Sequence, residues 1–305
     1  MDERKLIETV WAQLGPKPHA RLRLGIGDDA SVHAVRAGYE WVVSTDASIA
    51  GVHWPSDFPL EDAARKAVAA ALSDLAAMGA EPEAVWAAVG APDTDAVLAL
   101  AAGVGRALDA HEVPLAGGDL TRAPVAMLAL TCAGWVPEGT AMRRDRAQVG
   151  ETVWLAGPVG LAHLALKQWQ AGRRQGGMIK FFVPQARLHT GMRLRELGVR
   201  CCIDVSDGLL LDAERVALAS GVGMEIDLDA TPAWSALVEK VGLEAAIEAV
   251  ASGGEDYALL FTAPKDKGFL EEIAAPIGRV VEGGGVRAFV AGREVQPRRR
   301  GFVHF

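Results

Sequence analysis

Short apolar runs rich in β-branched residues alternate along this chain with longer segments in which apolar positions recur every three or four residues. The clearest of the longer segments is residues 60–78, which is predicted to be an α-helix that ends at Gly79. Its apolar stripe consists of Ala64, Val68, Ala71, Leu72 and Leu75. This alternation predicts a layered α/β architecture and not a helical bundle or a β-sandwich.

The same pattern predicts two domains, and the chain of 305 residues is long enough for them. In the first half, strands are predicted over residues 21–26, 41–45, 84–89, 113–116 and 124–136, with helices over 60–78 and 93–110. In the second half, strands are predicted over 152–156, 200–205, 222–228 and 257–262, with helices over 161–170, 185–197 and 209–219. The polar, arginine-rich stretch 137–150 interrupts the pattern. We therefore expect one domain over residues 1–138 and another over 139–305.

Composition excludes several classes of function. The net charge of −8 argues against sequence-independent binding to nucleic acid, which needs a basic surface. The longest apolar stretches are far shorter than the roughly 20 residues that cross a bilayer, and the charged residues 1–5 are not followed by the apolar segment of a secretory signal. We therefore expect a cytoplasmic protein without membrane contact. Its three cysteines, Cys132, Cys201 and Cys202, have no zinc spacing and are expected to be free thiols.

Acidic residues recur in glycine-containing turns that follow predicted strands. These turns are Gly25-Ile26-Gly27-Asp28-Asp29, Ser44-Thr45-Asp46, Gly117-Gly118-Asp119, Asp204-Val205-Ser206-Asp207-Gly208 and Gly253-Gly254-Glu255-Asp256-Tyr257. A further acid, Asp74, lies within the predicted alanine-rich helix. Ligands bind where the strands of α/β sheets end, and repulsion among gathered carboxylates is tolerable when cations lie between them. Because Mg2+ commonly binds a few carboxylates together with substrate phosphates, the pattern predicts a Mg2+ site for a nucleotide.

Each motif also has a structural explanation, because Asp and Gly are common in turns and helix caps. The recurrence of one pattern at five turns and a helix favours a function. The stretch from Gly25 to Ala30 matches a dinucleotide-binding fingerprint, but its carboxylates would repel a pyrophosphate that carries no metal ion. No P-loop and no protein-kinase motif is present. His53 follows Asp46 after a short loop, and either faces the same site or serves the fold. The basic run at residues 298–300 is either a solvated surface or a phosphate contact.

In this order, the motifs resemble those of the thiamine-monophosphate kinase family, within the wider superfamily that includes aminoimidazole ribonucleotide synthetase and selenophosphate synthetase. The resemblance covers nearly the whole chain. It rests on GIGDDA from residue 25, STD from 44, GVHW from 51, LSDLAAMGA from 72, GGDLTR from 117, IDVSDGL from 203, GGEDY from 253 and the final GFVHF. It implies the two-domain α/β (α+β) fold of the superfamily, with an N-terminal mixed sheet covered by helices and a C-terminal α/β domain.

The resemblance also implies an activity and the residues that perform it. It implies transfer of the γ-phosphoryl group of ATP to thiamine monophosphate with Mg2+, giving thiamine diphosphate and ADP, in a homodimer. The positions that correspond to metal ligands are Asp29, Ser44, Thr45, Asp46, Asp74, Asp119, Asp204 and Asp207, of which Asp46, Asp74, Asp119 and Asp207 are expected to be catalytic. Nucleotide contacts correspond to His111, Gly118, Asp119, Arg144 and Ser206, and substrate contacts to His53, Glu255, Asp256 and Phe302. The first domain is thereby implied to bind ATP and Mg2+ and to dimerise, and the second to complete the nucleotide and substrate site.

Three positions depart from the family pattern. His111 stands where a tyrosine is usual, Ala258 replaces the acid that follows the GGEDY tyrosine, and Trp54 replaces a phenylalanine. The chemistry fits the residues independently, since a phosphate monoester is largely anionic at neutral pH and needs no strong base. Two alternatives stay open. One is another ATP-dependent member of the superfamily with a different phosphate-bearing substrate, and the other is a non-catalytic nucleotide-binding protein.

Overall fold

The computed structural model describes residues 3–14, 21–26, 29–174, 179–265 and 268–303. The chain forms two compact units. Unit 1 comprises Met1–Leu75 and Ala80–Gly139, and unit 2 comprises Ala76–Gly79 and Thr140–Phe305. Gly27 and Asp28 of the first acidic motif, and His304 and Phe305 of the C-terminal motif, lie outside the described residues.

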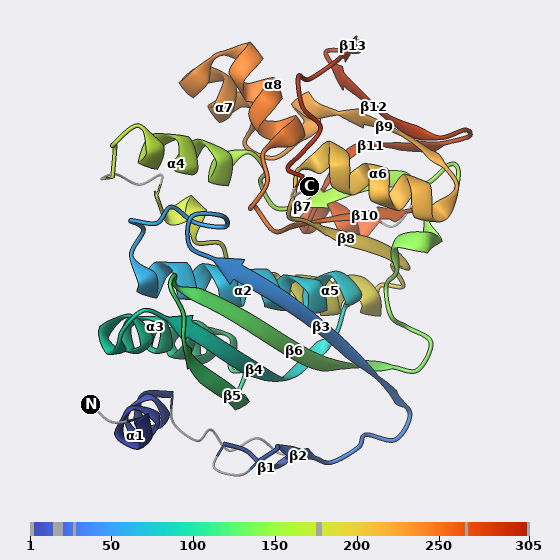
Figure 1. The fold of residues 1–305 in the computed structure, drawn as a ribbon. Coiled ribbons are helices and arrows are strands. Elements are labelled where there is room, and N and C mark those ends of the chain that lie inside the picture. The colour runs from blue at the N-terminus through green and yellow to red at the C-terminus, as the bar shows by residue number, and fades with distance from the viewer. Residues whose placement is uncertain (1–2, 15–20, 27–28, 175–178, 266–267, 304–305) are drawn as a thin grey trace. The chain divides into compact units, whose positions relative to one another are not determined.

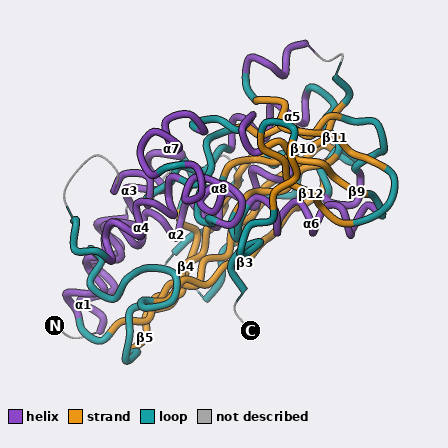
Figure 2. Tube along the Cα trace, turned by 90° about the horizontal axis from the view of Figure 1, so that it is seen from above, coloured by secondary structure: helices purple, strands orange, loops and turns teal. Residues whose placement is uncertain are grey.

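Unit 1 is built on a four-stranded mixed sheet. Its strands stand in the order β3 (Tyr39–Ile49), β6 (Met127–Pro137), β4 (Glu81–Ala91) and β5 (Leu115–Arg122). β6 pairs antiparallel with β3 and β4, whereas β5 runs parallel to β4. Figure 1 and Figure 2 show the helices α2 (Leu60–Met78) and α3 (Thr94–His111) along one side of these strands, with α1 (Glu3–Leu14) beside α3. A separate antiparallel pair is formed by β1 (Leu22–Leu24) and β2 (Val32–His33).

Small residues hold the helices of unit 1 close together. Gly103 in α3 faces α2, where a Cβ atom would lie 2.2 Å from the carbonyl oxygen of Glu61 and 2.7 Å from the Cβ of Ala64. Only glycine permits this approach, which lets the alanine-rich side of α2 become a buried core face. The sheet face that points away from the helices is less covered. There Trp41 and Val43 are 40% and 52% exposed.

Unit 2 is built on a seven-stranded sheet. Its strand order is β13 (Arg293–Val295), β12 (Gly285–Val290), β9 (Gly223–Asp227), β11 (Ala275–Val281), β7 (Thr152–Ala156), β10 (Ala258–Ala263) and β8 (Cys201–Val205). β12 and β9 are parallel, and the other neighbours are antiparallel.

Helices complete unit 2 (Figure 1). They are α4 (Leu161–Gln170), α5 (Leu188–Glu196), α6 (Leu209–Ser220), α7 (Trp234–Val241) and α8 (Leu243–Ser252), with the short 3-10 helices η1 (Arg144–Arg146), η2 (Ile179–Phe182), η3 (Leu228–Ala230) and η4 (Gly268–Glu272). The main core lies between the sheet and α6 and α8, where strand residues such as Ile203 and Leu260 pack against Leu209, Val216 and Val250. This packing positions the turn that joins β8 to α6.

The predicted α/β layering is confirmed, and α2, β7 and α4 begin and end at the predicted residues. The sequence did not predict α1, α7, α8 or β11 to β13. The expectation that Asp46 and Asp119 follow the ends of strands is wrong, because β3 continues to Ile49 and β5 to Arg122. β6 pairs with β3 along its full length, and this pairing overrides the polar residues at 44–46.

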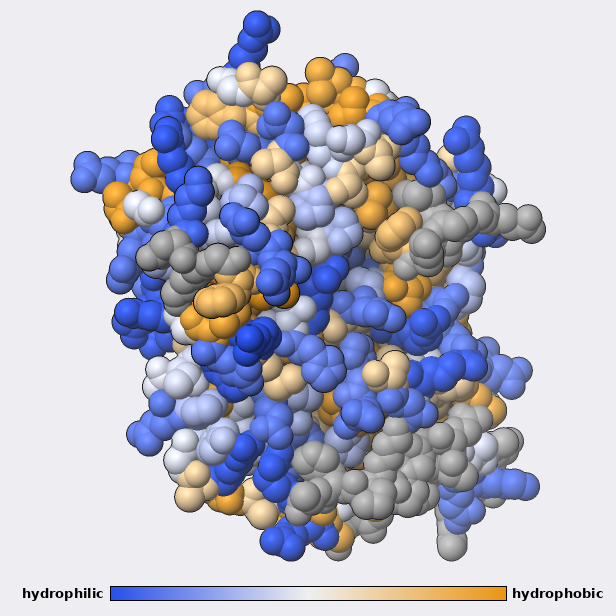
Figure 3. Space-filling model, turned by 180° about the vertical axis from the view of Figure 1, so that it is seen from behind, coloured by the Kyte–Doolittle hydropathy of each residue, from blue (hydrophilic) through white to orange (hydrophobic). Residues whose placement is uncertain are grey.

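Within the residues described, no helix is long and apolar enough to cross a membrane. On the face shown in Figure 3, hydrophobic atoms (orange) form small separate groups among hydrophilic ones (blue). The three cysteines are free, as predicted, and all are buried.

Candidate functional site

Three of the predicted metal-ligand side chains come together in unit 1. Successive side chains of a strand point to opposite faces, so Ser44 and Asp46 in β3 share one face. This is the face that α2 covers, since the Ser44 hydroxyl donates a hydrogen bond to the Asp74 carboxylate. Burial raises the pKa of the Cys132 thiol to about 12, with contributions from the nearby charges of Asp74 and Asp46. One hydroxyl and two carboxylates therefore gather beside Cys132.

Two other predicted residues of this region are placed differently. The side chain of Thr45 lies on the opposite face of β3, where its hydroxyl is 2.9 Å from that of Thr131. His53 lies in the turn after β3, and its Nδ1 accepts the backbone N–H of Ile49 at 3.0 Å. When the ring is neutral, this bond leaves the proton on Nε2, so His53 presents a donor to its surroundings.

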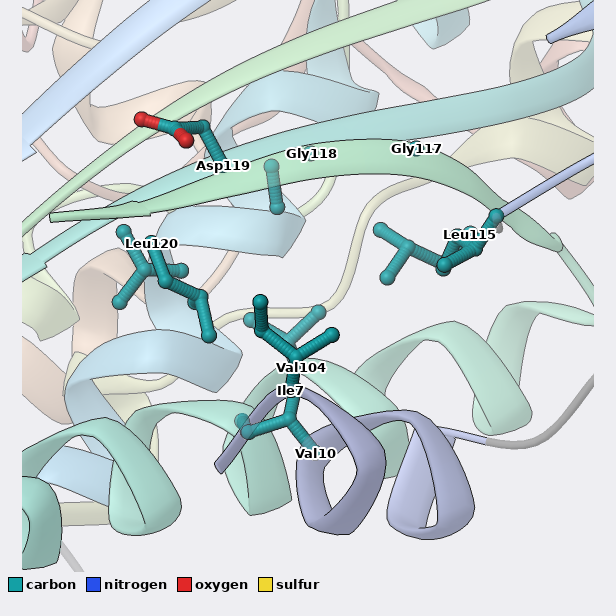
Figure 4. A pocket seen from close by; sticks show the side chains of 12 residues that line it. Ile7, Val10, Val104, Leu115, Gly117, Gly118, Asp119 and Leu120 are labelled. Atoms are coloured by element: carbon teal, nitrogen blue, oxygen red, sulfur yellow. The ribbon is translucent and has the colours of Figure 1, made fainter. Parts of the chain in front are cut away.

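Gly118 and Asp119 in β5 border an apolar cavity of about 150 Å3. The cavity is lined mainly by Ile7, Val10, Val104, Leu115 and Leu120. In Figure 4, Leu120 points toward α1, whereas the Asp119 carboxylate points to the other side of β5. A Cβ atom on Gly118 would lie 2.2 Å from the carbonyl oxygen of Ala87. The pairing of β5 with β4 therefore requires glycine here, whatever Gly118 contributes to a nucleotide.

A buried carboxylate that sequence reasoning missed anchors the segment around Asp29. Asp29 itself is exposed and lies between β1 and β2. Glu83 is fully buried and accepts hydrogen bonds from the Arg21 Nε at 2.7 Å and the Trp135 Nε1 at 3.1 Å. Its other oxygen is 3.3 Å from the His33 Nδ1. Both flanks of the Asp29 segment are thus tied to β4. The available signal was the pair of acids, Glu81 and Glu83, at the start of this otherwise apolar strand.

In unit 2, the turn from β8 to α6 carries Asp204, Ser206 and Asp207. Asp204 is buried at the end of β8. The turn is held by Asp212, a fully buried acid of α6 that was not predicted to take part. Its Oδ2 accepts the backbone N–H groups of residues 206, 207 and 208 at 3.0, 3.0 and 3.2 Å. Burial raises the pKa of Asp212 to about 6, against the opposing effects of Arg215 and these N–H donors.

Two distant segments of the chain meet this turn. The backbone N–H of Glu255 donates to the carbonyl oxygen of Ser206 at 2.7 Å, and that of Phe302 donates to the carbonyl oxygen of Asp207 at 2.9 Å. Gly254 packs so closely that a Cβ atom would lie 2.4 Å from the Ser206 oxygen. The structure therefore brings together Ser206, Asp207, Glu255 and Phe302, four of the predicted site residues of unit 2.

The backbone of segment 253–257 is strained, and Asp256, its second acidic residue, caps the start of α4. Glu255 and Tyr257 have φ values of 73° and 50°, which are costly for residues with side chains and occur mostly at functional sites. Asp256 turns toward α4, where it accepts the backbone N–H groups of Gly160 at 2.6 Å and Ala162 at 2.9 Å. Burial raises the pKa of the Asp256 carboxyl to about 7, although these N–H donors oppose the rise. Asp256 thus acts as a helix cap in this structure.

Two predicted nucleotide contacts remain, and the backbone of Arg144 lies apart from the turn at Ser206 within its own unit. His111 is the last residue of α3. Arg144 is exposed, and its carbonyl oxygen accepts the Ser220 hydroxyl at the C-terminal end of α6. The turn at Ser206 lies at the other end of this helix, about 18 Å away at 1.5 Å per residue.

The donors that gather here fit Mg2+. They are carboxylate and hydroxyl oxygens, which hard cations prefer, and in unit 1 they share one site between β3 and α2. Among the described residues, no three His, Cys, Asp or Glu side chains form a group able to hold a metal ion alone. Mg2+ at nucleotide sites takes one or two carboxylates and completes its shell with phosphates and water. The donor set therefore suits a metal ion carried by a nucleotide and not an all-protein cage.

Comparison with known proteins identifies relatives over nearly the full length. Residues 27–136 match the family model of the AIR synthase related protein N-terminal domain, and residues 148–291 match that of its C-terminal domain. The chain is 34% identical over 304 residues to the thiamine-monophosphate kinase of Caulobacter vibrioides, covering 92% of this chain and 85% of the relative. It also resembles the crystal structure of thiamine-monophosphate kinase from Stenotrophomonas maltophilia, with a TM-score of 0.84, 36% identity and coverage of 97% and 98%. A structure of AaThiL complexed with AMPPCP and TMP matches with a TM-score of 0.78, 28% identity and coverage of 99% and 97%.

Proposed function

This chain belongs to the thiamine-monophosphate kinase family, and on that premise we propose that it phosphorylates thiamine monophosphate with ATP in a Mg2+-dependent reaction. The reaction moves the γ-phosphoryl group of ATP onto the substrate phosphate and yields thiamine diphosphate and ADP. The solved relative with AMPPCP and TMP bound supports both substrates. The alternative activities left open by the sequence are not favoured by these relatives.

The observation that carries the Mg2+ proposal is the hydrogen bond between Ser44 and Asp74, with Asp46 on the same face of β3. Hydroxyl and carboxylate oxygens converge there, between β3 and α2. We propose as metal ligands the residues that the resemblance assigns: Asp29, Ser44, Thr45, Asp46, Asp74 and Asp119 of unit 1 and Asp204 and Asp207 of unit 2. The side chain of Thr45 points to the opposite face of β3, so only its backbone can contact a metal ion on the Ser44 side.

The residues present suit a reaction governed by alignment. The attacking phosphate oxygen is largely anionic at neutral pH, so the chain needs no strong general base. When bound, Mg2+ neutralises charge on the β- and γ-phosphates of the nucleotide. The chain holds the reactants: His53 presents an N–H group, and the half-exposed ring of Phe302 offers a face for a cationic ring, an attraction worth roughly 0.5 to 2 kcal/mol. The proposed nucleotide contacts are His111, Gly118, Asp119, Arg144 and Ser206, and Glu255 and Asp256 complete the proposed substrate contacts.

We propose that the protein acts as a cytoplasmic homodimer, with the free sheet face of unit 1 as the interface. Trp41 and Val43 are exposed on that face, next to the Thr45–Thr131 pair. An exposed apolar patch on a sheet face is a candidate interaction surface. The size of the wild type and of Trp41→Glu, measured by light scattering, tests this. A monomeric wild type would refute the proposed homodimer. A dimeric Trp41→Glu variant would show that the interface does not include this face.

The activity is tested with purified protein, ATP, Mg2+ and thiamine monophosphate, by chromatographic detection of thiamine diphosphate. We expect Asp74→Asn to lose more than about 100-fold in turnover, because a neutral amide is a poor ligand for Mg2+. Asp62→Asn is the matched control, since Asp62 lies on the same helix but pairs with Arg65 at the surface. It should keep normal turnover.

Two outcomes would contradict parts of this proposal. Normal turnover by both Asp74→Asn and Asp207→Asn would refute the metal-ligand assignment. A wild type that leaves thiamine monophosphate untouched, but consumes ATP with another phosphate ester, would refute the substrate and leave the metal site standing.

A further inference from the structure

Helix α6 of unit 2 carries two side chains that hold the turn at residues 206–208, here named the Asp207 turn. Asp212 lies in the first turn of α6 and has no exposed surface. Its Oδ2 accepts three consecutive backbone N–H groups, those of residues 206 to 208. Gly208 adopts a φ of 134°, and a Cβ atom there would lie 3.0 Å from the backbone of Ser252. The shape of the turn is therefore set by a side chain six residues beyond its first member.

Arg215 links this buried acid to Asp207. It stands three residues after Asp212, on the same side of α6. One terminal nitrogen of its guanidinium is 2.5 Å from the Asp212 Oδ1, and the other is 2.5 Å from the Asp207 Oδ2. The planar fork of arginine suits such a bridge between two carboxylates. Asp207 is thus held through both its backbone N–H and its side chain.

The bridge engages only one oxygen of Asp207. Among the described residues, no hydrogen bond reaches its Oδ1, and the side chain is 23% exposed. Carboxylates that bind metal ions through one oxygen are commonly fixed by a hydrogen bond to the other. Arg215 provides that bond, and the fully buried Asp212 fixes Arg215 in turn.

We propose that Arg215 and Asp212 are positioning residues for metal binding, which hold Asp207 by its Oδ2 so that its Oδ1 faces the metal ion of the nucleotide. This inference rests on the proposed function, because it takes Asp207 as a metal ligand. Neither residue touches the metal ion or the substrate. Their contribution is to the affinity for the metal ion, and not to the transfer step once the ion is bound.

The test measures metal binding directly. Free Mn2+ is followed by electron paramagnetic resonance while Mn2+ is titrated into the full-length protein with AMPPCP present. We expect Arg215→Gln to weaken Mn2+ binding about tenfold, the lower end of the range for partners of metal ligands. Arg215→Lys keeps a cationic donor and should recover part of that loss. Arg193→Gln is the matched control, since Arg193 pairs with Glu196 at the surface of α5, and it should bind Mn2+ as the wild type does.

A kinetic comparison separates positioning from damage to the fold. Arg215→Gln should raise the Mg2+ concentration for half-maximal rate about tenfold while kcat at saturating Mg2+ changes less than about threefold. Its melting temperature without metal should stay within a few degrees of that of Arg193→Gln, because Arg215 is 40% exposed. Asp212→Asn keeps an acceptor for the turn but loses the charge that fixes Arg215, and should follow Arg215→Gln in Mn2+ affinity.

Unchanged or tighter Mn2+ binding by Arg215→Gln overturns this inference, since the arginine would then be neutral toward the metal ion or compete with it. An equal loss of kcat and metal affinity overturns it as well. If the wild type binds no Mn2+ with AMPPCP, the proposed Mg2+ site fails first. The two failures are therefore distinguishable in one titration.

Discussion

The Asp256 carboxyl offers a sharp test of the electrostatics of unit 2, because two opposing effects act on it. Burial raises its pKa to about 7, while the N–H groups of Gly160 and Ala162 favour the ionised form. In an unfolded chain, aspartate has a pKa of about 3.9. The folded protein therefore binds this proton more tightly than the unfolded chain does. The free energy of unfolding should fall as pH rises from about 4 to about 7, and this effect should level off above that range.

The size of the effect follows from the difference in pKa. About 3 pKa units correspond to about 4 kcal/mol, and roughly 2 to 3 kcal/mol of this falls between pH 5 and pH 8. Because Asp256 as a whole residue is only partly buried, we expect the lower value, a loss of about 2 kcal/mol in the free energy of unfolding between pH 5 and pH 8. Asp256→Asn has no such proton to lose. It leaves one backbone N–H unpaired, which costs about 1 to 3 kcal/mol at every pH.

The measurement is urea unfolding of wild type and Asp256→Asn at pH 5, 6, 7 and 8, followed by tryptophan fluorescence. Relative to wild type, the variant should gain about 2 kcal/mol between pH 5 and pH 8, because the other titrating groups cancel in the difference. Asp95→Asn, on the exposed side of α3, controls for the substitution itself. A constant difference between wild type and Asp256→Asn across this range would refute the reasoning. It would mean that the N–H donors outweigh burial and keep Asp256 ionised.

Three further outcomes test the packing. Glu83→Ala removes the acceptor of Arg21 and Trp135, and urea unfolding should show a free energy of unfolding lower by about 3 kcal/mol. The exposed control Glu138→Ala should lower it by less than about 0.5 kcal/mol. Equal effects of the two substitutions would contradict the buried network. Gly118→Ala should lower the melting temperature sharply, unlike Gly284→Ala, whose Cβ would meet nothing within 4 Å. The three buried thiols should resist a thiol reagent at pH 8 until denaturant is added, because burial raises the pKa of Cys132 to about 12 and that of Cys201 to about 11. Rapid labelling of the native protein would show that these sites open.

Much of the fold was readable because its signals are local. The helix over residues 60–78 shows one apolar stripe and a glycine stop, and α2 has these bounds. Strand ends were harder to predict, since Asp46 reads as a turn residue. The pairing of β3 with β6 determines where β3 ends. This pairing joins residues that are distant in the sequence, such as Thr45 and Thr131, which are 86 positions apart.

The candidate site was predictable as a set of residue types and less so as an arrangement. The recurring Gly and Asp pattern pointed to Ser206, Asp207 and Glu255, which the structure brings together. It could not reveal that Asp212 organises their turn, because an acid in the first turn of a helix is ordinarily a capping or dipole effect. Nor could it pair Arg21 with Glu83, since no local pattern links residues 62 positions apart.

The meeting of three segments at the Asp207 turn has a consequence for how the chain can vary. The contacts from residues 255 and 302 to this turn are made by backbone N–H and C=O groups, which every amino acid except proline supplies in full. Side chains at residues 255 and 302 can change without breaking these contacts, but an insertion or deletion directly beside either residue would displace the backbone N–H group that makes the contact. Variation among relatives should therefore appear there as substitutions, with changes of length confined to the outlying loops.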